Sequence, residues 1–244
     1  RVVDAPGSHE DGVPERYDAV IVAGGRSSRL GGVDKTALLW NGVPLRDWAL
    51  RSLNGAERIA YVGGVAPTAL THSSNLQTAR NAPHSPAVIV TREHPPFAGP
   101  AAAVQAGLQA LPSPSAPWTV VIAADLPRVT AAVAVLLHEL RAIGGVDAAG
   151  AELQGVIAVD GTSRRQPLLA VYRTSALLAA VHSHSSEKSG LVGLSMRQLL
   201  TGLRLHELTL SDALCADVDT PADAVRAGIA VTEPHGVAAA DGAR

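Results

Sequence analysis

Glycines, small polar residues and cations are concentrated in one short segment that follows a run of apolar residues. From position 20 to position 35 the chain reads Val-Ile-Val-Ala-Gly-Gly-Arg-Ser-Ser-Arg-Leu-Gly-Gly-Val-Asp-Lys. Glycine lets backbone N–H groups approach a phosphate where a Cβ would collide, and fixed cations offset the charge of phosphate oxygens. The segment matches neither the Walker pattern Gly-x-x-x-x-Gly-Lys-[Ser/Thr] nor the dinucleotide pattern Gly-x-Gly-x-x-Gly. It therefore predicts an anion-binding loop of another kind, with a flexible strand-to-helix turn as the alternative.

A carboxylate ends a second apolar run, Val120-Val-Ile-Ala-Ala-Asp125. Ligands bind at the carboxyl ends of parallel strands, so we expect Asp125 on the same rim as the glycine loop. One Asp suits Mg²⁺, which prefers few carboxylates together with phosphate oxygens and waters. The alternative is that Asp125 caps the following helix. In Asp217-Val-Asp219-Thr-Pro, Asp219 is a candidate second metal ligand, and a plain helix-entry turn is the alternative.

Other reactive residue types favour structural roles. Glu93, in Arg-Glu-His-Pro-Pro-Phe, is expected to be a solvated loop charge. His182 and His184 lack further ligands at metal-binding spacing, so we expect them on the surface. Cys215 has no neighbouring cation or second cysteine, which favours a buried, inert thiol. The pair 164–165, Arg-Arg, either meets an anionic acceptor or stays solvated at a turn.

Alternating strand and helix patterns must position these residues. Short apolar runs predict buried strands, whereas apolar residues at helical spacing predict helices between them. Right-handed crossovers then give an α/β fold, a mostly parallel sheet flanked by helices in three layers, with antiparallel additions in the second half. Thr220 as cap, Pro221 and Asp223 predict a last helix over about 221–230. The strands are expected at 19–23, 59–62, 88–90, 120–123, 156–159 and 168–172, and the helices at stripes starting from 45, 101 and 133 and at 195–200.

Composition limits the class of protein. The 244 residues are 47% hydrophobic and 17% charged, with a formal net charge of -2, as in packed domains. Twenty Lys and Arg are balanced by 22 Asp and Glu, which argues against a nucleic-acid partner. No apolar run reaches the ~18–20 residues of a membrane span. One cysteine favours the cytoplasm. We expect one domain over 17–231, with flexible arms at 1–16 and 232–244.

Five ordered motifs resemble the molybdenum cofactor guanylyltransferase family, the MobA-like nucleotidyltransferases with a Rossmann-like, GT-A-like fold. They cover roughly 17–228 of the chain. Two departures separate the chain from the family pattern: Thr36 follows Lys35 where the family usually has Gly or Pro, and Ala-Ala-Ala follows Gly99-Pro100 where it has Leu-Ala-Gly. The matching motifs are the loop ending in Lys35, Gly99-Pro100, Asp125-Leu-Pro127, Gln166-Pro-Leu168 with Tyr172-Arg173, and Asp219-Thr-Pro221.

The resemblance implies Mg²⁺-dependent transfer of GMP from GTP to the phosphate of molybdopterin, with release of pyrophosphate. Lys35 would stabilise the triphosphate and the leaving group, Arg29 would assist it or order the loop, and Asp125 would bind Mg²⁺, with Asp219 as the second candidate ligand. The acceptor would enter from the second half of the chain. The predicted nucleotide-binding residues are Ala23, Gly24, Gly25, Arg26, Ser27, Ser28, Gly31, Gly32, Lys35, Gly99, Pro100 and Asp125.

Two alternatives to this interpretation stay open. The enzyme could transfer cytidylate or another nucleotide to a related pterin, a sugar phosphate or phospholactate. It could also be an accessory protein that binds a nucleotide without turnover. Handover of a labile cofactor would involve transient contacts with molybdoenzyme maturation proteins. All readings require Lys35 and Asp125 to share one cleft.

Overall fold

A seven-stranded sheet forms the centre of the computed structural model, which describes residues 16–24, 34–67, 86–113, 115–147, 150–185 and 190–229. The strand order is β5-β4-β1-β6-β8-β7-β9. β1 is parallel to β4 and β6, whereas β8 runs antiparallel to both of its neighbours, β6 and β7. The strands are β1 Tyr17–Ala23, β4 Arg58–Gly63, β5 Ala87–Thr91, β6 Trp118–Ala123, β7 Gly155–Val159, β8 Arg165–Arg173 and β9 His206–Thr209.

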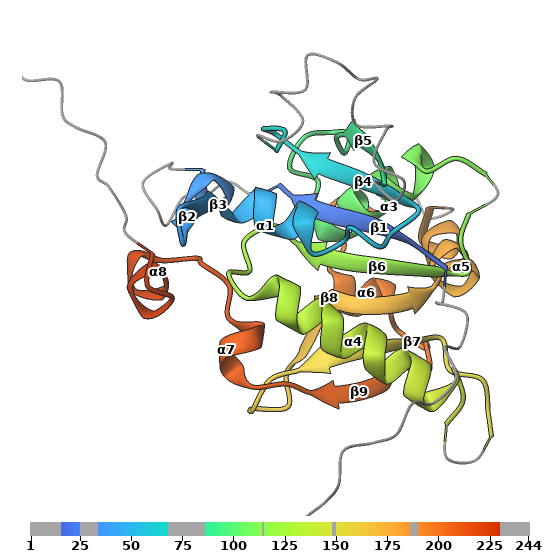
Figure 1. Cartoon of the computed structure of the whole chain (residues 1–244). Helices are drawn as coiled ribbons and strands as arrows, with labels where there is room; N and C mark the ends of the chain where they lie inside the picture. The colour runs from blue at the N-terminus through green and yellow to red at the C-terminus, as the bar shows by residue number, and fades with distance from the viewer. Residues whose placement is uncertain are drawn as a thin grey trace, which may run out of the picture.

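Helices cover both faces of this sheet, which gives the predicted three layers (Figure 1). α1 and α4 pack on one face, and α3, α5 and α6 pack on the other. A two-stranded hairpin of β2 and β3 stands apart from the main sheet. The remaining elements are η2 Lys35–Ala37, β2 Leu39–Trp40, β3 Val43–Pro44, α1 Leu45–Arg51, α3 Pro100–Ala110, α4 Val129–Ile143, α5 Thr174–Ser185, α6 Met196–Leu199, α7 Asp212–Cys215 and α8 Pro221–Arg226.

The central strands are apolar on both faces because both faces are covered. In β1, Ala19 and Ile21 belong to the core under α4, and the alternate residues Val20 and Val22 belong to the core under α3. All four side chains are buried. This pattern produces the continuous hydrophobic runs that predicted buried parallel strands. It also brings the carboxyl ends of β1, β4 and β6 to one rim of the sheet.

The last helix begins as predicted and ends earlier than predicted. The Thr220 side chain accepts a hydrogen bond from the Asp223 backbone, and the Asp223 carboxylate accepts one from the Thr220 backbone, which forms a reciprocal cap. The helix ends at Arg226 instead of about position 230, because Gly228 adopts a positive φ of 73° that breaks the helical path.

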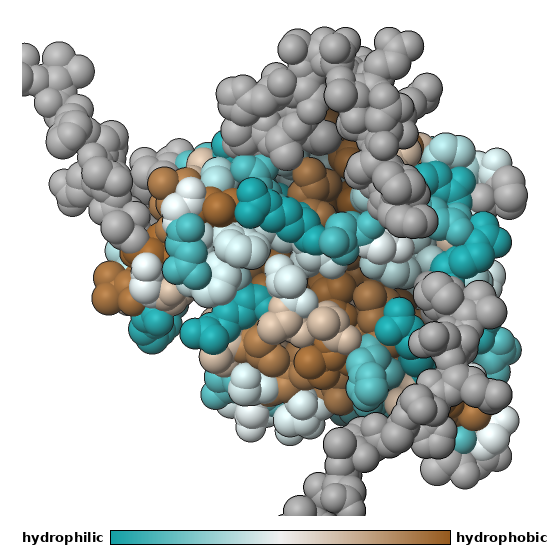
Figure 2. All heavy atoms as spheres, viewed as in Figure 1, coloured by the Kyte–Doolittle hydropathy of each residue, from teal (hydrophilic) through white to brown (hydrophobic). Residues whose placement is uncertain are grey.

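Two exposed apolar residues, Leu39 in β2 and Val225 in α8, lie at the edge where Figure 2 shows separate hydrophobic groups, and the other exposed apolar residues are spread over other elements. No helix among the described residues is long and apolar enough to cross a membrane. The predicted arms at 1–16 and 232–244 lie almost wholly outside the described residues, with Arg16 the exception. The domain boundaries therefore stay predictions.

Candidate active site

A cavity of about 850 Å³ opens at the rim where β1 and β6 end. Its wall includes Ala23, the last residue of β1, Gly24 after it, Asp125 after β6, and the hairpin that joins β7 to β8. Parallel sheets bind ligands at this rim, where loops can vary without disturbing the strands. The cavity is therefore the natural place to look for the predicted chemistry.

Lys35 reaches this cavity from the first turn of η2. Asp34 caps that turn, since its carboxylate accepts hydrogen bonds from the Thr36 backbone at 3.0 Å and from the Thr36 hydroxyl at 2.8 Å. Thr36 is buried, so its difference from the family pattern is accommodated inside the fold. The Lys35 ammonium forms ion pairs with Asp125 and, at 2.8 Å, with Asp219. The structure thus brings Lys35 and Asp125 together, as all the functions considered above require.

Asp125 is fixed by the strand that precedes it. The Ala124 N–H donates to the carbonyl of Val22 at 3.0 Å, which extends the pairing of β6 with β1 to the edge of the cavity. The Asp125 side chain is buried, and its Oδ1 atom has no hydrogen-bond partner among the described residues. It does not cap α4, whose N-cap position is Arg128. The helix-cap alternative is therefore wrong.

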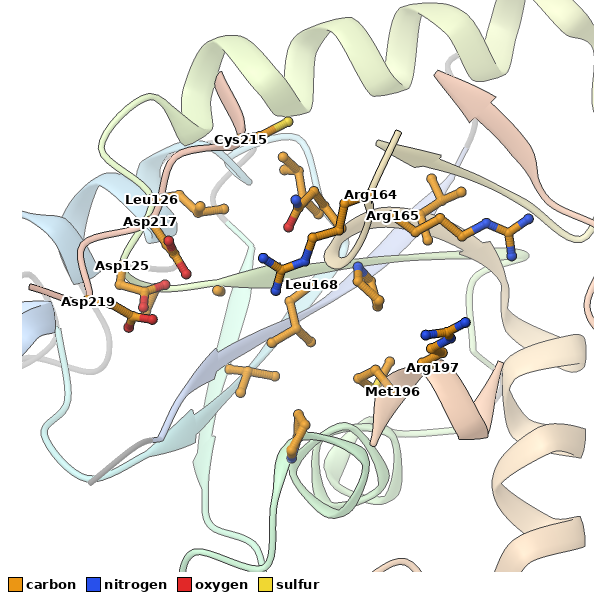
Figure 3. Close-up of a pocket in the computed structure, with 18 of the residues that line it drawn as sticks. Asp125, Leu126, Arg164, Arg165, Leu168, Met196, Arg197, Cys215, Asp217 and Asp219 are labelled. Atoms are coloured by element: carbon orange, nitrogen blue, oxygen red, sulfur yellow. The ribbon is translucent and has the colours of Figure 1, made fainter. Parts of the chain in front are cut away.

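The Asp-Val-Asp segment before α8 contributes two more carboxylates. Val218 is fully buried, and its N–H donates to the Asp125 carbonyl at 3.2 Å. Alternation along an extended segment then turns the flanking Asp217 and Asp219 toward the cavity, as Figure 3 shows. The Asp219 backbone is held in turn by the Asp223 carboxylate at 3.2 Å. Asp217 was outside the predicted ligand set, although its segment was recognised.

A small hydrophobic cluster joins the early and late parts of the site. Leu38 and Leu45, next to Lys35 in sequence, pack with Val218, Ala224 and Ile229 from the end of the described chain. This cluster lies apart from the two cores on the sheet faces. Burial of this cluster holds the two segments together, so Lys35 and Asp219, 184 positions apart in the sequence, can form a hydrogen bond.

The three aspartates form an acidic cluster that suits a divalent cation. One carboxylate oxygen from each of Asp125, Asp217 and Asp219 lies within 4.8 Å of the others. Burial raises the pKa of Asp217, and the neighbouring charges of Asp125 and Asp219 raise it further. Burial alone would lower the pKa of Lys35, but the Asp125 and Asp219 carboxylates raise it above its ordinary value. Oxygen-only ligands and excess negative charge fit Mg²⁺ or a similar hard cation.

Glu93 contradicts the expectation of a solvated loop charge. Its side chain is buried, with 6% of its surface exposed, and its Oε1 atom accepts a hydrogen bond from the Phe97 N–H at 2.9 Å. The Oε2 atom is buried and has no hydrogen-bond partner among the described residues. A Cβ built on Gly24 would lie 3.6 Å from Oε1. The loop turns back at Phe97 and encloses the Glu93 carboxylate. The polar, proline-rich sequence of this loop does not predict that burial.

The other predicted nucleotide-binding residues divide into two groups. Ala23, Gly24 and Pro100 line the cavity, and Gly99 opens α3 with a φ of 105°, a conformation that favours glycine. Their role in binding a nucleotide stays a prediction. The rest of the loop, Gly25, Arg26, Ser27, Ser28, Arg29, Gly31 and Gly32, lies outside the described residues.

The cavity wall also includes residues whose role the sequence leaves undecided or expects to be structural. Arg164 and Arg165 both line it, and so does Arg197 from α6, which the sequence did not single out. Cys215 is buried as expected, and burial raises the pKa of its thiol to about 11, which argues against a nucleophile. His184 is half-buried, and its Nδ1 atom contacts the Ala180 carbonyl at the end of α5.

Comparison with known proteins identifies close parallels in sequence and fold. Residues 19–207 match the family model described as MobA-like NTP transferase domain. A molybdenum cofactor guanylyltransferase of Burkholderia ambifaria is 32% identical over 158 residues, which are 64% of this chain and 70% of that protein. The family match spans the loop at 24–35, the strand β6 and Asp125.

Solved structures show the same fold at low sequence identity. The molybdopterin-guanine dinucleotide biosynthesis protein A of Archaeoglobus fulgidus superposes with a TM-score of 0.56 and 21% identity, over 86% of this chain and 96% of that one. Rv0371C of Mycobacterium tuberculosis, solved in complex with manganese, gives a TM-score of 0.52 and 17% identity, over 87% and 97%.

Proposed function

The chain belongs to the MobA-like NTP transferase family, and on that premise we propose that it transfers GMP from GTP to the phosphate of molybdopterin with Mg²⁺ and releases pyrophosphate. The nucleotidyltransferase class follows from the family. The base, the metal and the acceptor are the proposed parts. The observation that supports metal-dependent phosphate chemistry is the contact of Lys35 with Asp125 and Asp219 at the rim of the sheet.

The reaction needs charge control more than a protein nucleophile. An oxygen of the acceptor phosphate attacks the α-phosphorus of GTP, a new P–O bond forms, and the bond to the β-phosphate oxygen breaks to free pyrophosphate. The acceptor is already an oxyanion, so the protein must align two anions that repel each other and offset their charge. Asp125, Asp217 and Asp219 would hold Mg²⁺, which when bound neutralises negative charge on the phosphates.

Lys35 supplies the mobile positive charge in this scheme. Its ammonium is paired with Asp125 and Asp219, two of the carboxylates that would hold Mg²⁺. A cation held there would compensate the charge of these carboxylates, and Lys35 would then be available to the triphosphate. A lysine on a flexible stem can make that exchange with little backbone movement. Arg29 and the glycine loop keep the phosphate-binding role predicted for them.

Glu93 supports guanine as the base. Its buried Oε2 atom has no hydrogen-bond partner among the described residues, and its carboxylate lies within 4.0 Å of the Cβ position of Gly24, a residue of the cavity wall. Guanine presents two adjacent N–H donors on its Watson–Crick edge, whereas cytosine places an acceptor nitrogen beside its single amino group. A carboxylate can only accept hydrogen bonds, so it favours guanine and is repelled by the cytosine ring nitrogen.

The test is to offer each NTP with Mg²⁺ and molybdopterin and to measure pyrophosphate. We expect release with GTP and a small fraction of that rate with CTP, ATP or UTP. Glu93→Gln should narrow the preference for GTP over CTP, because the amide can donate to cytosine. Turnover with CTP and not GTP would replace this proposal by the cytidylyl alternative.

Two further controls address the remaining alternatives. Sugar phosphates and phospholactate replace molybdopterin in parallel reactions, and turnover with one of them alone would change the acceptor. Nucleotide binding without release of pyrophosphate in any reaction would favour the accessory protein. We propose a cytoplasmic location and contacts with molybdoenzyme maturation proteins because molybdopterin is the proposed acceptor. A different acceptor would remove the basis for both.

A further inference from the structure

The short turn that carries Lys35 is held by the side chain of its own cap residue. The Oδ1 atom of Asp34 accepts two hydrogen bonds from Thr36, one from its backbone N–H at 3.0 Å and one from its hydroxyl at 2.8 Å. The Ala37 N–H donates to the Asp34 carbonyl at 3.0 Å. Because Lys35 is the first of the three residues of η2, the direction in which its side chain leaves the backbone depends on the Asp34 cap.

Asp34 has other partners within reach. Its Oδ2 atom lies 3.6 Å from the Nη1 atom of Arg46 on α1, and 40% of its side-chain surface is exposed. The carboxylate could therefore turn outward, toward Arg46 and water, with its charge still compensated. The Thr36 hydroxyl adds a second hydrogen bond to the one from the Thr36 backbone, and this bond favours the inward position of the carboxylate.

The Thr36 hydroxyl lies in a buried environment. Only 4% of the surface of Thr36 is exposed, and its neighbour Tyr61 of β4 is fully buried. Burial raises the pKa of Tyr61 to about 12, and the nearby Thr36 side chain acts against this rise. The Tyr61 hydroxyl has no hydrogen-bond partner among the described residues. Bulk water therefore cannot substitute for the Thr36 hydroxyl if that group is removed.

The direction of Lys35 matters because its ammonium contacts two carboxylates at once. Asp125 follows β6, whereas Asp219, at 2.8 Å, precedes α8. We propose that Thr36 is a positioning residue, whose hydroxyl holds the Asp34 cap inward and thereby directs Lys35 between Asp125 and Asp219. The value of this position for turnover rests on the proposed function, whereas the position itself does not depend on it.

NMR of the lysine side chains tests the position directly, because the chain contains two lysines, Lys35 and Lys188. Protein labelled with ¹⁵N at lysine Nζ and carrying Lys188→Arg retains one ammonium signal, that of Lys35. Without nucleotide or metal, this ammonium should exchange protons slowly with water, since two carboxylates hold it. In the same background, Thr36→Val should speed the exchange by roughly threefold or more. Thr36→Ser, which keeps the hydroxyl, should restore most of the difference.

Thr119→Val is the matched control for the loss of a buried hydroxyl. Thr119 is fully buried, and its hydroxyl bonds to that of Thr174 at 2.9 Å, at the end of β6 away from Asp125. This variant should lower the free energy of unfolding in urea about as much as Thr36→Val, with the Lys35 signal unchanged. Unchanged exchange in Thr36→Val, an equal change in Thr119→Val, or no recovery in Thr36→Ser would overturn the proposal.

Turnover then separates the position of Lys35 from its use. With GTP and molybdopterin, Thr36→Val should lower kcat by roughly tenfold and change the KM for molybdopterin by less than about twofold, because Lys35 is proposed to act on the triphosphate and the leaving group. Faster ammonium exchange together with an unchanged kcat would support the positioning role of Thr36 and contradict the role of Lys35 in the proposed function.

Discussion

Lys35 is held between Asp125 and Asp219, where it balances part of the charge that a divalent cation would balance. Removing the ammonium should therefore have opposite effects on metal binding and on catalysis. Lys35→Met should tighten binding of Mn²⁺ to the nucleotide-free protein, measured by electron paramagnetic resonance, because three carboxylates lose their internal counter-ion. The same variant should lose roughly 10²-fold or more in turnover.

Arg51→Met is the matched control, since Arg51 lies over Trp48 on α1 and contacts none of the three aspartates. It should leave both Mn²⁺ affinity and turnover nearly unchanged. Unchanged or weaker Mn²⁺ binding in Lys35→Met would mean that Lys35 does not compete with a cation for the acidic cluster.

Single residues also show where sequence reasoning ends. Lys35 and Asp125 could be paired from the sequence because each follows a strand pattern with a clear end. The burial of Glu93 could not be predicted from the sequence, because it depends on a turn at Phe97 that brings the chain back over the carboxylate. Asp217 lies in an Asp-Val-Asp segment that the sequence singles out, but its direction toward the cavity depends on the burial of Val218. Arg197 has no distinctive local pattern.

Among the elements, α3 packs unusually close to the sheet. A Cβ added to Gly107 would lie 2.5 Å from a Val20 methyl carbon and 3.1 Å from one of Val62. Gly107→Ala should therefore lower the free energy of unfolding by about 1–2 kcal/mol, because overpacking outweighs the gain of about 1 kcal/mol in helix propensity. Urea unfolding measures the difference, and Gln109→Ala, on the exposed side of α3, is the control. A more stable Gly107→Ala protein would contradict the close contact.

Elements with strong apolar patterns were predicted well, and short or polar ones were missed. The strands at the centre of the sheet and helices α1, α3 and α4 lie where the sequence predicts them. β9, with the sequence His-Glu-Leu-Thr, is four residues long and lies at the edge of the sheet, so its alternation is too brief to identify. The hairpin of β2 and β3 has two residues in each strand. The end of α8 lies at Arg226 and not at about position 230, because apolar spacing alone does not predict the positive φ of Gly228 that ends the helix.

Across the whole molecule, Asp18 ties three neighbouring strands together at the edge opposite the cavity. Its fully buried carboxylate accepts hydrogen bonds from Arg58 at 2.8 and 2.9 Å and from the Ala116 N–H at 2.8 Å. Asp18→Ala should lower the free energy of unfolding by about 3 kcal/mol, because Arg58 keeps its charge and loses its main partner. Turnover per folded molecule should stay unchanged, since the site lies at the other end of β1.

The double variant Asp18→Val with Arg58→Met is the informative control. It removes both charges, so it should recover much of the stability lost in Asp18→Ala. Thermal denaturation with turnover measured at a temperature where all variants are folded checks both claims. A loss of turnover at full folding would link this buried pair to the site and contradict its purely structural role.

The reversed direction of β8 has a consequence for how such a molecule can diversify. Because β7 runs toward the rim and β8 runs away from it, the connecting hairpin is a self-contained module that begins and ends at the cavity. Its length and tip can be exchanged without altering the register of β1, β4 and β6, which would hold the nucleotide in the proposed function. The parallel strands can thus stay the same among related proteins, while the β7–β8 hairpin changes to fit a different acceptor.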